Sequence, residues 1–325
     1  MSVLVIGGGL IGSQIARILV EAGARPVVMD LAPQREALAD IVDPEKITLV
    51  RGDVLDRPGL EYVLREHDVS RVVHTAANPL LTLGAQENPY SAVQVNVVGT
   101  CNVLEAARAL KLGRVVVASS NVLSHHLAGG ADGGDVMRED PFPRPATFYS
   151  ATKQAVEALG LNYARWCGVD FVAVRYGAAA GPWRGRGGGG PSNIFRAAVE
   201  SALRGEEASV PPGAIDWVYS KDAARGAVLA LDAPRLENRV FNIAMGRLYD
   251  GEALAAAIRE AIPGARIRVA TPPGTAVSVQ PMAGSVDLSR ARAELGYVPA
   301  YDMAAAVRDY VAWYRAHVSD EEKRA

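Results

Sequence analysis

The chain has 325 residues, enough for one large domain or two modest ones, each with its own core. Its charge is nearly balanced, with 34 Lys and Arg against 36 Asp and Glu and no long basic block, so nucleic acid is not an expected partner. Cys101 and Cys167 lack metal-ligand spacing, so we expect no metal site and a reducing, cytoplasmic environment. The apolar run at the start is too short for a signal peptide or a membrane span, so no membrane partner is expected either.

Short runs rich in Val and Ile alternate with longer helical patterns up to about residue 176. The runs are VLVIG, PVVMD, ITLVRGD, SRVVHTAA, RVVVASS and DFVAVRYG. This alternation is typical of a parallel sheet whose strands are joined by helices. The sequence therefore predicts an α/β fold, a doubly wound sheet of the Rossmann type covered by helices on both faces.

A glycine-rich turn joins the first strand to the first helix. Gly7, Gly9 and Gly12 stand in a G-x-G-x-x-G arrangement, which lets the backbone approach a pyrophosphate at the positive end of the helix. Asp30 ends the second strand, 18 residues past Gly12, where a carboxylate accepts hydrogen bonds from both ribose hydroxyls and repels a 2'-phosphate. Asp53 follows the third strand and could meet the adenine amino group. The pattern predicts a dinucleotide site that prefers NAD to NADP.

After residue 176 the alternation loosens. A segment rich in Gly and Pro is followed by a helix expected near Asp222, a late strand in NRVFNIA and an amphipathic stretch at 302–317. We therefore expect an NAD-binding domain at 1–176, to which 216–244 returns. Residues 177–215 and 245–325 should form a smaller, mostly helical substrate-binding cap that closes over the carboxyl ends of the strands.

The stretch YSATK sets Tyr149 one helical turn before Lys153, so that their polar ends can serve one site. The spacing by itself also suits two ordinary residues at the start of a helix. The rest of the chain decides between these interpretations.

Taken together, these patterns resemble the extended short-chain dehydrogenases/reductases, the NAD-dependent epimerase/dehydratase group. The resemblance extends over nearly the whole chain. Besides the glycine loop, GDVLD and YSATK, it includes HTAA (74–77), NVVGTCNVLEAAR (96–108), VVASS (116–120), VRYGAAAGP (174–182), DWVYSKDAARG (216–226), FNIA (241–244) and RAELGYVP (292–299).

The resemblance implies a role for each matching residue. Tyr149 is implied as the acid/base that moves a proton on or off a substrate oxygen while hydride passes to or from the nicotinamide. Lys153 is implied to stabilise the phenolate and to hold the nicotinamide ribose, and Ser120 to orient the substrate oxygen. Asn96 is similar to the asparagine whose helix kink and water link back to the lysine. Further cofactor contacts are expected from Leu10, Ile11, Val54 and Ala76.

The sequence also departs from the family. Its glycine loop is shorter by one residue than in many members, and NVLSHH stands after Ser120 in place of the usual Val-Tyr-Gly. The basic residue usual before Asp216 and the arginine usual in the approach to RAELGY are missing, which removes the clamps that a sugar-nucleotide diphosphate needs. Arg184, Arg186 or Arg196 could replace them. Candidate substrate contacts are Asn121, His125, Trp183, Asn193 and Trp217, the last three with packing between cap and sheet as an equal alternative.

The leading functional expectation is an NAD-dependent oxidoreductase for a secondary alcohol or ketone on a small sugar-like or polyhydroxylated substrate. The alternatives are a UDP-sugar-type 4-epimerase that keeps its NAD bound and a non-enzymatic NAD-sensing protein. A homodimer is expected through helices around 90–112 and 149–167, as in relatives. The glycine-rich loops at 128–135 and 184–191 are expected to flank the substrate mouth and to order on binding.

Overall fold

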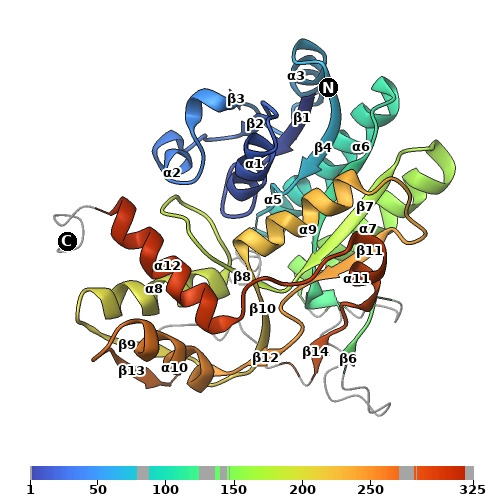
Figure 1. Cartoon of the computed structure of the whole chain (residues 1–325). Helices are drawn as coiled ribbons and strands as arrows, with labels where there is room; N and C mark the ends of the chain where they lie inside the picture. Colours follow the sequence, from blue (N-terminus) through green and yellow to red (C-terminus); the bar gives the residue numbers. More distant parts are fainter. Residues whose placement is uncertain are drawn as a thin grey trace.

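The computed structural model describes residues 2–78, 88–123, 136–139, 145, 147–270, 282 and 284–318. Within this part of the chain, seven parallel strands form the large sheet (Figure 1). In spatial order they are β11 (Val240–Ile243), β7 (Phe171–Tyr176), β5 (Val115–Ser120), β4 (Val69–His74), β1 (Ser2–Ile6), β2 (Val27–Asp30) and β3 (Thr48–Arg51). The predicted Rossmann-type sheet is confirmed.

Both faces of the sheet are buried, as the runs of Val and Ile predicted. Along β1, Val3 and Val5 belong to one core cluster, whereas Leu4 and Ile6 belong to the other. Alternate side chains of a strand point to opposite faces, so each cluster lies on its own side of the sheet. The apolar runs without alternation are therefore those of strands covered twice.

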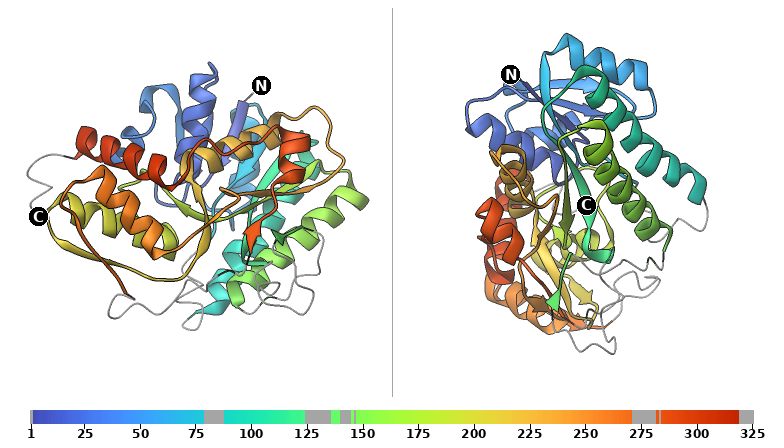
Figure 2. Two further views of the ribbon diagram at one scale, coloured as in Figure 1. Left: turned by 60° about the horizontal axis from the view of Figure 1, so that its bottom comes forward. Right: turned by 90° about the vertical axis from the view of Figure 1, so that its right-hand side faces the viewer.

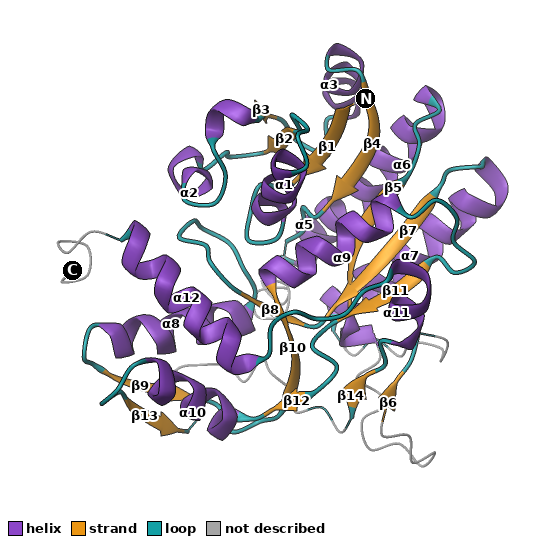
Figure 3. Cartoon of the chain, viewed as in Figure 1, coloured by secondary structure: helices purple, strands orange, loops and turns teal. Residues whose placement is uncertain are grey.

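Helices from distant parts of the sequence cover each face (Figure 3). On one face, α1 (Gly12–Glu21) packs against α9 (Ser220–Asp232), which also contacts β4, β5, β7 and β11. On the other face lie α3 (Arg57–Glu66), α6 (Gly99–Leu110) and α7 (Phe148–Cys167). Shorter pieces connect them: α2 (Arg35–Ala39), η1 (Pro44–Lys46), α5 (Pro89–Val93) and the π-helical turn η2 (Gln94–Val98).

The strand order reverses between β1 and β4. From β1 the chain moves outward through β2 and β3, then returns to the other side of β1 for β4. Ligands of such sheets bind in the crevice beyond the carboxyl ends of the strands at this point. The glycine loop that follows β1 lies at this crevice.

The remaining elements pack together beside the carboxyl ends of the strands (Figures 1 and 2). They include α8 (Gly190–Leu203), α10 (Gly251–Ala261) and α12 (Met303–His317), together with strands β6 (Val136–Met137), β8 (Ala178–Ala180), β9 (Glu207–Val210), β10 (Ile215–Tyr219), β12 (Leu248–Tyr249), β13 (Arg266–Val269) and β14 (Ser285–Val286). Helix α11 (Ser289–Leu295) instead packs against β11 and α9. The order β12-β10-β8 makes a small sheet, so strands contribute to this region more than the sequence predicted. β10 lies in that sheet, and the chain rejoins the large sheet with α9 and β11.

Among the described helices, none combines the length and the apolar character needed to cross a membrane.

Candidate active site

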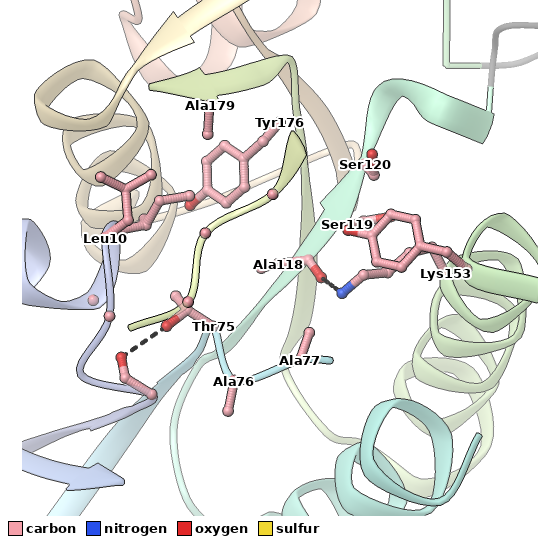
Figure 4. Close-up of a pocket in the computed structure, with 18 of the residues that line it drawn as sticks. Leu10, Thr75, Ala76, Ala77, Ala118, Ser119, Ser120, Lys153, Tyr176 and Ala179 are labelled. Atoms are coloured by element: carbon pink, nitrogen blue, oxygen red, sulfur yellow. Dashed lines mark hydrogen bonds between the residues drawn. The ribbon is translucent and has the colours of Figure 1, made fainter. Parts of the chain in front are cut away.

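A cavity of about 700 Å³ lies where the carboxyl ends of the large sheet meet the second region (Figure 4). Its walls come from the loops after β1, β2, β3, β4, β5 and β7 and from the segment that leads into α8. This volume is in the range of sites for small ligands and cofactors. The cavity therefore joins the expected cofactor site to the expected catalytic residues.

The glycine loop forms one wall of the cavity and is built by close backbone contacts. A Cβ atom at Gly12 would collide with the carbonyl oxygen of Gly7, and one at Gly7 would lie 2.7 Å from the amide nitrogen of Ala76. The hydroxyl of Thr75 donates to the carbonyl oxygens of Ile6 and Gly7 at 3.1 and 3.0 Å and fixes the turn (Figure 4). Gly9, in contrast, has nothing within 4 Å of its missing Cβ and faces open space. The loop is thus shaped to admit another molecule at Gly9.

Asp30 lies at the same wall, at the end of β2. Its Oδ2 accepts a hydrogen bond from the amide of Gly8 at 2.9 Å, and its Oδ1 accepts one from the amide of Ala32 at 2.9 Å. These bonds hold the carboxylate next to the glycine loop. The other residues expected at the cofactor line the same cavity, namely Gly7, Gly9, Leu10, Ile11, Gly12, Asp53, Val54 and Ala76. The backbone arrangement and the carboxylate fit the ribose and diphosphate of NAD.

Tyr149, Lys153 and Ser120 lie together at the opposite part of the cavity. Thr147 and Ser150 form a reciprocal capping box that starts α7, so Tyr149 falls in the first turn and Lys153 one turn later. Nζ of Lys153 lies 5.6 Å from the centre of the Tyr149 ring and donates to the carbonyl oxygen of Ala118 at 2.7 Å (Figure 4). Ser120 ends β5 on the neighbouring wall.

Burial shifts the titration of both groups on α7. It raises the pKa of Tyr149 to about 12, although a hydrogen bond with Ser120 acts in the opposite direction. It lowers the pKa of Lys153 to about 8, against the influence of the Glu157 carboxylate. Burial disfavours each charged form, so the phenol keeps its proton in the protein alone. Loss of that proton requires additional positive charge or hydrogen bonds at the phenolate oxygen.

Asn96 lies in the π-helical turn η2 and is buried. Its Oδ1 accepts a hydrogen bond from the amide of Asn78 at 2.8 Å, and its Nδ2 donates to the hydroxyl of Thr152 at 3.1 Å. Thr152 directly precedes Lys153 on α7. Asn96 does not line the cavity itself, so it contacts the site indirectly, through Thr152.

The residues expected to contact substrate separate into two groups. Asn121 lines the cavity, whereas Trp183, Asn193 and Trp217 are absent from its walls. Trp217 packs against Phe195 with ring centres 6.2 Å apart, Trp183 is 3% exposed, and Asn193 is exposed on α8. Trp183 and Trp217 are thus placed as the packing alternative describes, whereas Asn193 lies at the surface. His125 lies outside the described residues.

Several wall residues were not singled out from the sequence. Tyr176, at the end of β7, has its hydroxyl buried without a partner among the described residues, and burial raises its pKa. Burial also raises the pKa of Asp216 to about 7, even though its carboxylate accepts the amides of Gly246 and Val286 at 3.1 and 2.9 Å. In the sequence, Tyr176 and Asp216 could have been found as polar residues that lie at the end of an apolar strand or within one. Gln34 gave no such signal, because it meets the backbone of Arg186 across 152 residues of sequence.

Three arginines were expected as possible replacements for the missing diphosphate clamps. Of these, Arg186 lines the cavity. Arg184 is paired with Asp40, with Nε 2.6 Å from Oδ2, and Arg196 does not line the cavity. No cluster of three or more His, Cys, Asp or Glu that could hold a metal ion occurs in the described ranges.

Comparison with known proteins places these features in a family. The model of the NAD-dependent epimerase/dehydratase family matches residues 3–244. The dTDP-glucose 4,6-dehydratase of Actinoplanes sp. is 29% identical, over 98% of this chain and 99% of that protein. The crystal structure of Thermus thermophilus UDP-glucose 4-epimerase with NAD is 27% identical with a TM-score of 0.81, covering 98% and 100% of the two chains.

A relative with another activity is equally similar in structure. The L-threonine dehydrogenase of Phytophthora infestans is 25% identical with a TM-score of 0.83, covering 98% of this chain and 100% of that one. The matched range contains the glycine loop, Asp30, Ser120, Tyr149 and Lys153. The chain belongs to the NAD-dependent epimerase/dehydratase family and is an NAD-dependent oxidoreductase of the extended short-chain dehydrogenase/reductase type.

Proposed function

We propose that the protein transfers hydride between NAD and a secondary alcohol or ketone of a small, sugar-like or polyhydroxylated substrate, with Tyr149 as the acid/base. One observation carries the proposal: Tyr149, Ser120 and Lys153 line the same cavity as the glycine loop and Asp30. A dinucleotide held by the glycine loop and Asp30 therefore reaches Tyr149, Ser120 and Lys153. NAD, when bound, supplies the nicotinamide ring that accepts or returns hydride.

The chain's own residues have distinct tasks in this proposal. The amides of the glycine loop and the first turn of α1 bind the diphosphate, and Asp30 accepts hydrogen bonds from the adenosine ribose. Asp53, Val54 and Ala76 border the adenine side. Lys153, whose Nζ donates to the carbonyl oxygen of Ala118, would hold the nicotinamide ribose. Residues 1–176 with 216–244 hold the cofactor, and 177–215 with 245–325 hold the substrate.

The proton is handled by two hydroxyl groups. Ser120 donates to the substrate oxygen and orients it, and Tyr149 takes the hydroxyl proton during oxidation or returns it during reduction. Because burial raises the pKa of Tyr149 to about 12, the charge of Lys153 and of the bound cofactor has to favour the phenolate. Asn96 acts as a positioning residue, because it fixes Thr152 next to Lys153.

The charges around the cavity favour a dehydrogenase over a sugar-nucleotide enzyme. Among the described residues that line it, the cations are Lys153 and Arg186. Arg184 is already paired with Asp40. The substrate side has the apolar walls of Val122, Ala178 and Ala179, which do not bind a diphosphate. The similarity to an L-threonine dehydrogenase supports this choice.

The second candidate is a UDP-sugar-type 4-epimerase with tightly bound NAD, supported by the similarity to UDP-glucose 4-epimerase. A screen for NADH formation over polyols, aldonates and sugars separates the two. The dehydrogenase predicts a substrate that yields NADH with the wild type and not with Tyr149→Phe. Interconversion of UDP-sugars without net NADH would overturn the dehydrogenase in favour of the epimerase.

A homodimer is also part of the proposal. Large apolar side chains are exposed on the helices expected to pair, including Tyr90, Val98, Leu159 and Trp166, the last 72% exposed. Burying such a surface in a four-helix contact removes it from water. We further propose that the protein acts in the cytoplasm, in keeping with its two free cysteines.

A further inference from the structure

A segment of the second region reaches back to the nucleotide-binding half of the protein. Residues 183–189, here called the strap, connect β8 to α8 and extend toward α1 and α2 (Figure 1). Arg186, Gly187, Gly188 and Gly189 of the strap line the cavity, as do Gly9, Gly12 and Asp30 of the nucleotide-binding half. The strap is therefore a wall of the cofactor site contributed by the other half of the molecule.

Two side chains of the nucleotide-binding half hold the strap. The amide of Gln34 pairs with the backbone of Arg186, where Nε2 donates to the carbonyl oxygen at 3.1 Å and Oε1 accepts from the amide nitrogen. Asp40 forms a two-pronged ion pair with Arg184, with distances of 2.6 and 3.0 Å. Gln34 follows Asp30 by one short turn. The strap is thus fastened beside the carboxylate proposed to bind the adenosine ribose.

The part of the strap that follows these fasteners is able to bend. Gly187 and Gly188 have φ of +100° and +93°, a conformation that other residues rarely adopt. Gly189 and Gly190 continue the run up to the start of α8. A fastened stretch followed by four glycines is a hinge arrangement, in which release of Gln34 and Asp40 opens one side of the cavity.

Arg186 gives the strap a chemical function. Its side chain is exposed, and it has no carboxylate partner among the described residues, so its charge is not neutralised within the protein. It lines the end of the cavity near Gln34 and Asp30, whereas Lys153 serves the end near Tyr149. NAD has its two negative charges at the diphosphate, between those ends. A planar guanidinium is well suited to pair with phosphate oxygens.

We propose that the strap is a closing element of the cofactor site: fastened by Gln34 and Asp40, it covers the adenosine-diphosphate half of a bound dinucleotide and pairs Arg186 with the diphosphate. NAD enters and leaves when the strap opens at its glycines. The inference rests on the proposed function, since it requires NAD in this cavity. In this proposal, Gln34, Asp40 and Arg186 control the rate of cofactor exchange but take no part in proton transfer.

The test measures the binding of NAD to purified, cofactor-free protein with no substrate present. Titration calorimetry gives the Kd, and stopped-flow fluorescence gives the association and dissociation rates. Arg186→Ala should raise the Kd for NAD about tenfold, the effect of losing one charge-assisted hydrogen bond. It should also weaken the dependence of Kd on salt concentration. Gln34→Ala should raise the dissociation rate about tenfold while the association rate stays equal or increases. Arg235→Ala, at an exposed arginine between α9 and β11, is the matched control and should bind as the wild type does.

The outcomes distinguish closure by the strap from binding of NAD in the cavity. If the wild type binds NAD and both Arg186→Ala and Gln34→Ala keep its Kd and its two rates, the strap does not close the cofactor site. The proposed function is then unaffected. A wild type that fails to bind NAD overturns both. Since Arg186 is exposed, its alanine variant folds irrespective of any effect of Gln34→Ala, and thermal melting of each variant confirms that a native protein was compared.

Discussion

Glu157 and Arg175 form a buried two-pronged ion pair behind the catalytic wall, with Nε to Oε1 at 2.8 Å and Nη2 to Oε2 at 2.7 Å. The hydroxyl of Ser119 donates to the same Glu157 Oε1 at 2.5 Å. Glu157 lies one turn after Lys153, Ser119 directly precedes Ser120, and Arg175 directly precedes Tyr176. One carboxylate therefore ties α7 and β5, which carry the catalytic side chains, to β7, which carries the wall residue Tyr176.

Replacing Glu157 by Gln should destabilise the protein by about 3 to 5 kcal/mol, because the buried guanidinium of Arg175 loses its counter-charge. Chemical denaturation of the variant and the wild type measures this difference. The double variant Glu157→Gln with Arg175→Met is the control and should recover much of the loss, since it leaves no unpaired charge. A single variant within 1 kcal/mol of the wild type would show that the pair has no such role.

Tyr149→Phe should reduce kcat by about a hundredfold to ten-thousandfold, the usual contribution of a positioned acid/base, and should leave the Kd for NAD nearly unchanged. The measurement is steady-state kinetics with a substrate from the NADH screen, together with NAD titration. Tyr163→Phe serves as the control on the same helix, since its hydroxyl bonds Glu105 away from the cavity. Equal activity of wild type and Tyr149→Phe would remove Tyr149 from the mechanism.

Asp30→Asn should lower the affinity for NAD about tenfold, because one charged acceptor for the ribose hydroxyls is lost. Binding of NADP should fall less or rise, since the variant no longer repels a 2'-phosphate. Titrations with both dinucleotides give the ratio of affinities. Asp232→Asn, which removes a surface carboxylate paired with Arg71, should change neither. An unchanged NAD to NADP ratio in Asp30→Asn would contradict the assignment of Asp30.

His74 should make the protein sensitive to acid. Burial lowers its pKa from 6.5 to about 3, and neither ring nitrogen has a hydrogen-bond partner among the described residues. The folded state thus binds fewer protons than the unfolded state between these values, so stability falls as pH falls below 6.5. Between pH 6.5 and pH 5 the loss amounts to about 2 kcal/mol.

His74→Leu is expected to remove that loss and to stay within about 1 kcal/mol of the wild type at pH 7, because it deletes unpartnered polar atoms. Urea denaturation at pH 7 and pH 5 gives the difference between the two proteins. His67→Leu, at a more exposed histidine at the end of α3, should keep the acid sensitivity of the wild type. Parallel loss of stability in His74→Leu and the wild type would disprove the explanation.

Trp166→Lys should convert the proposed homodimer to monomers, because a charge cannot be buried in an apolar contact without a partner. Size-exclusion chromatography with light scattering reports the mass. Tyr62→Lys replaces an aromatic residue that is 64% exposed on α3 and should leave the mass at that of the wild type. A wild type that runs as a monomer at micromolar concentration would exclude this assembly.

The features that the sequence predicted are those with local patterns. The glycine loop, Asp30 and the Tyr149–Lys153 turn each depend on a few neighbouring residues, and the periodicity of Val and Ile identifies the large sheet. The distortion at Asn96 followed from the resemblance. In contrast, the sequence around Trp183 and Trp217 is as compatible with a binding site as with a core. Only the three-dimensional structure distinguishes the two uses, because Trp217 packs against Phe195 and Trp183 is buried. Likewise, the contact of Gln34 with Arg186 depends on how the two halves of the chain meet.

The most direct test of the central claim is to purify the protein without added cofactor, denature it, count any dinucleotide released, and titrate the native protein with NAD. The account predicts a largely empty site that binds one NAD per chain reversibly, with NADP bound more weakly. One NAD per chain retained through purification would favour the epimerase cycle. A native protein that neither retains nor binds NAD would contradict the assignment of this cavity.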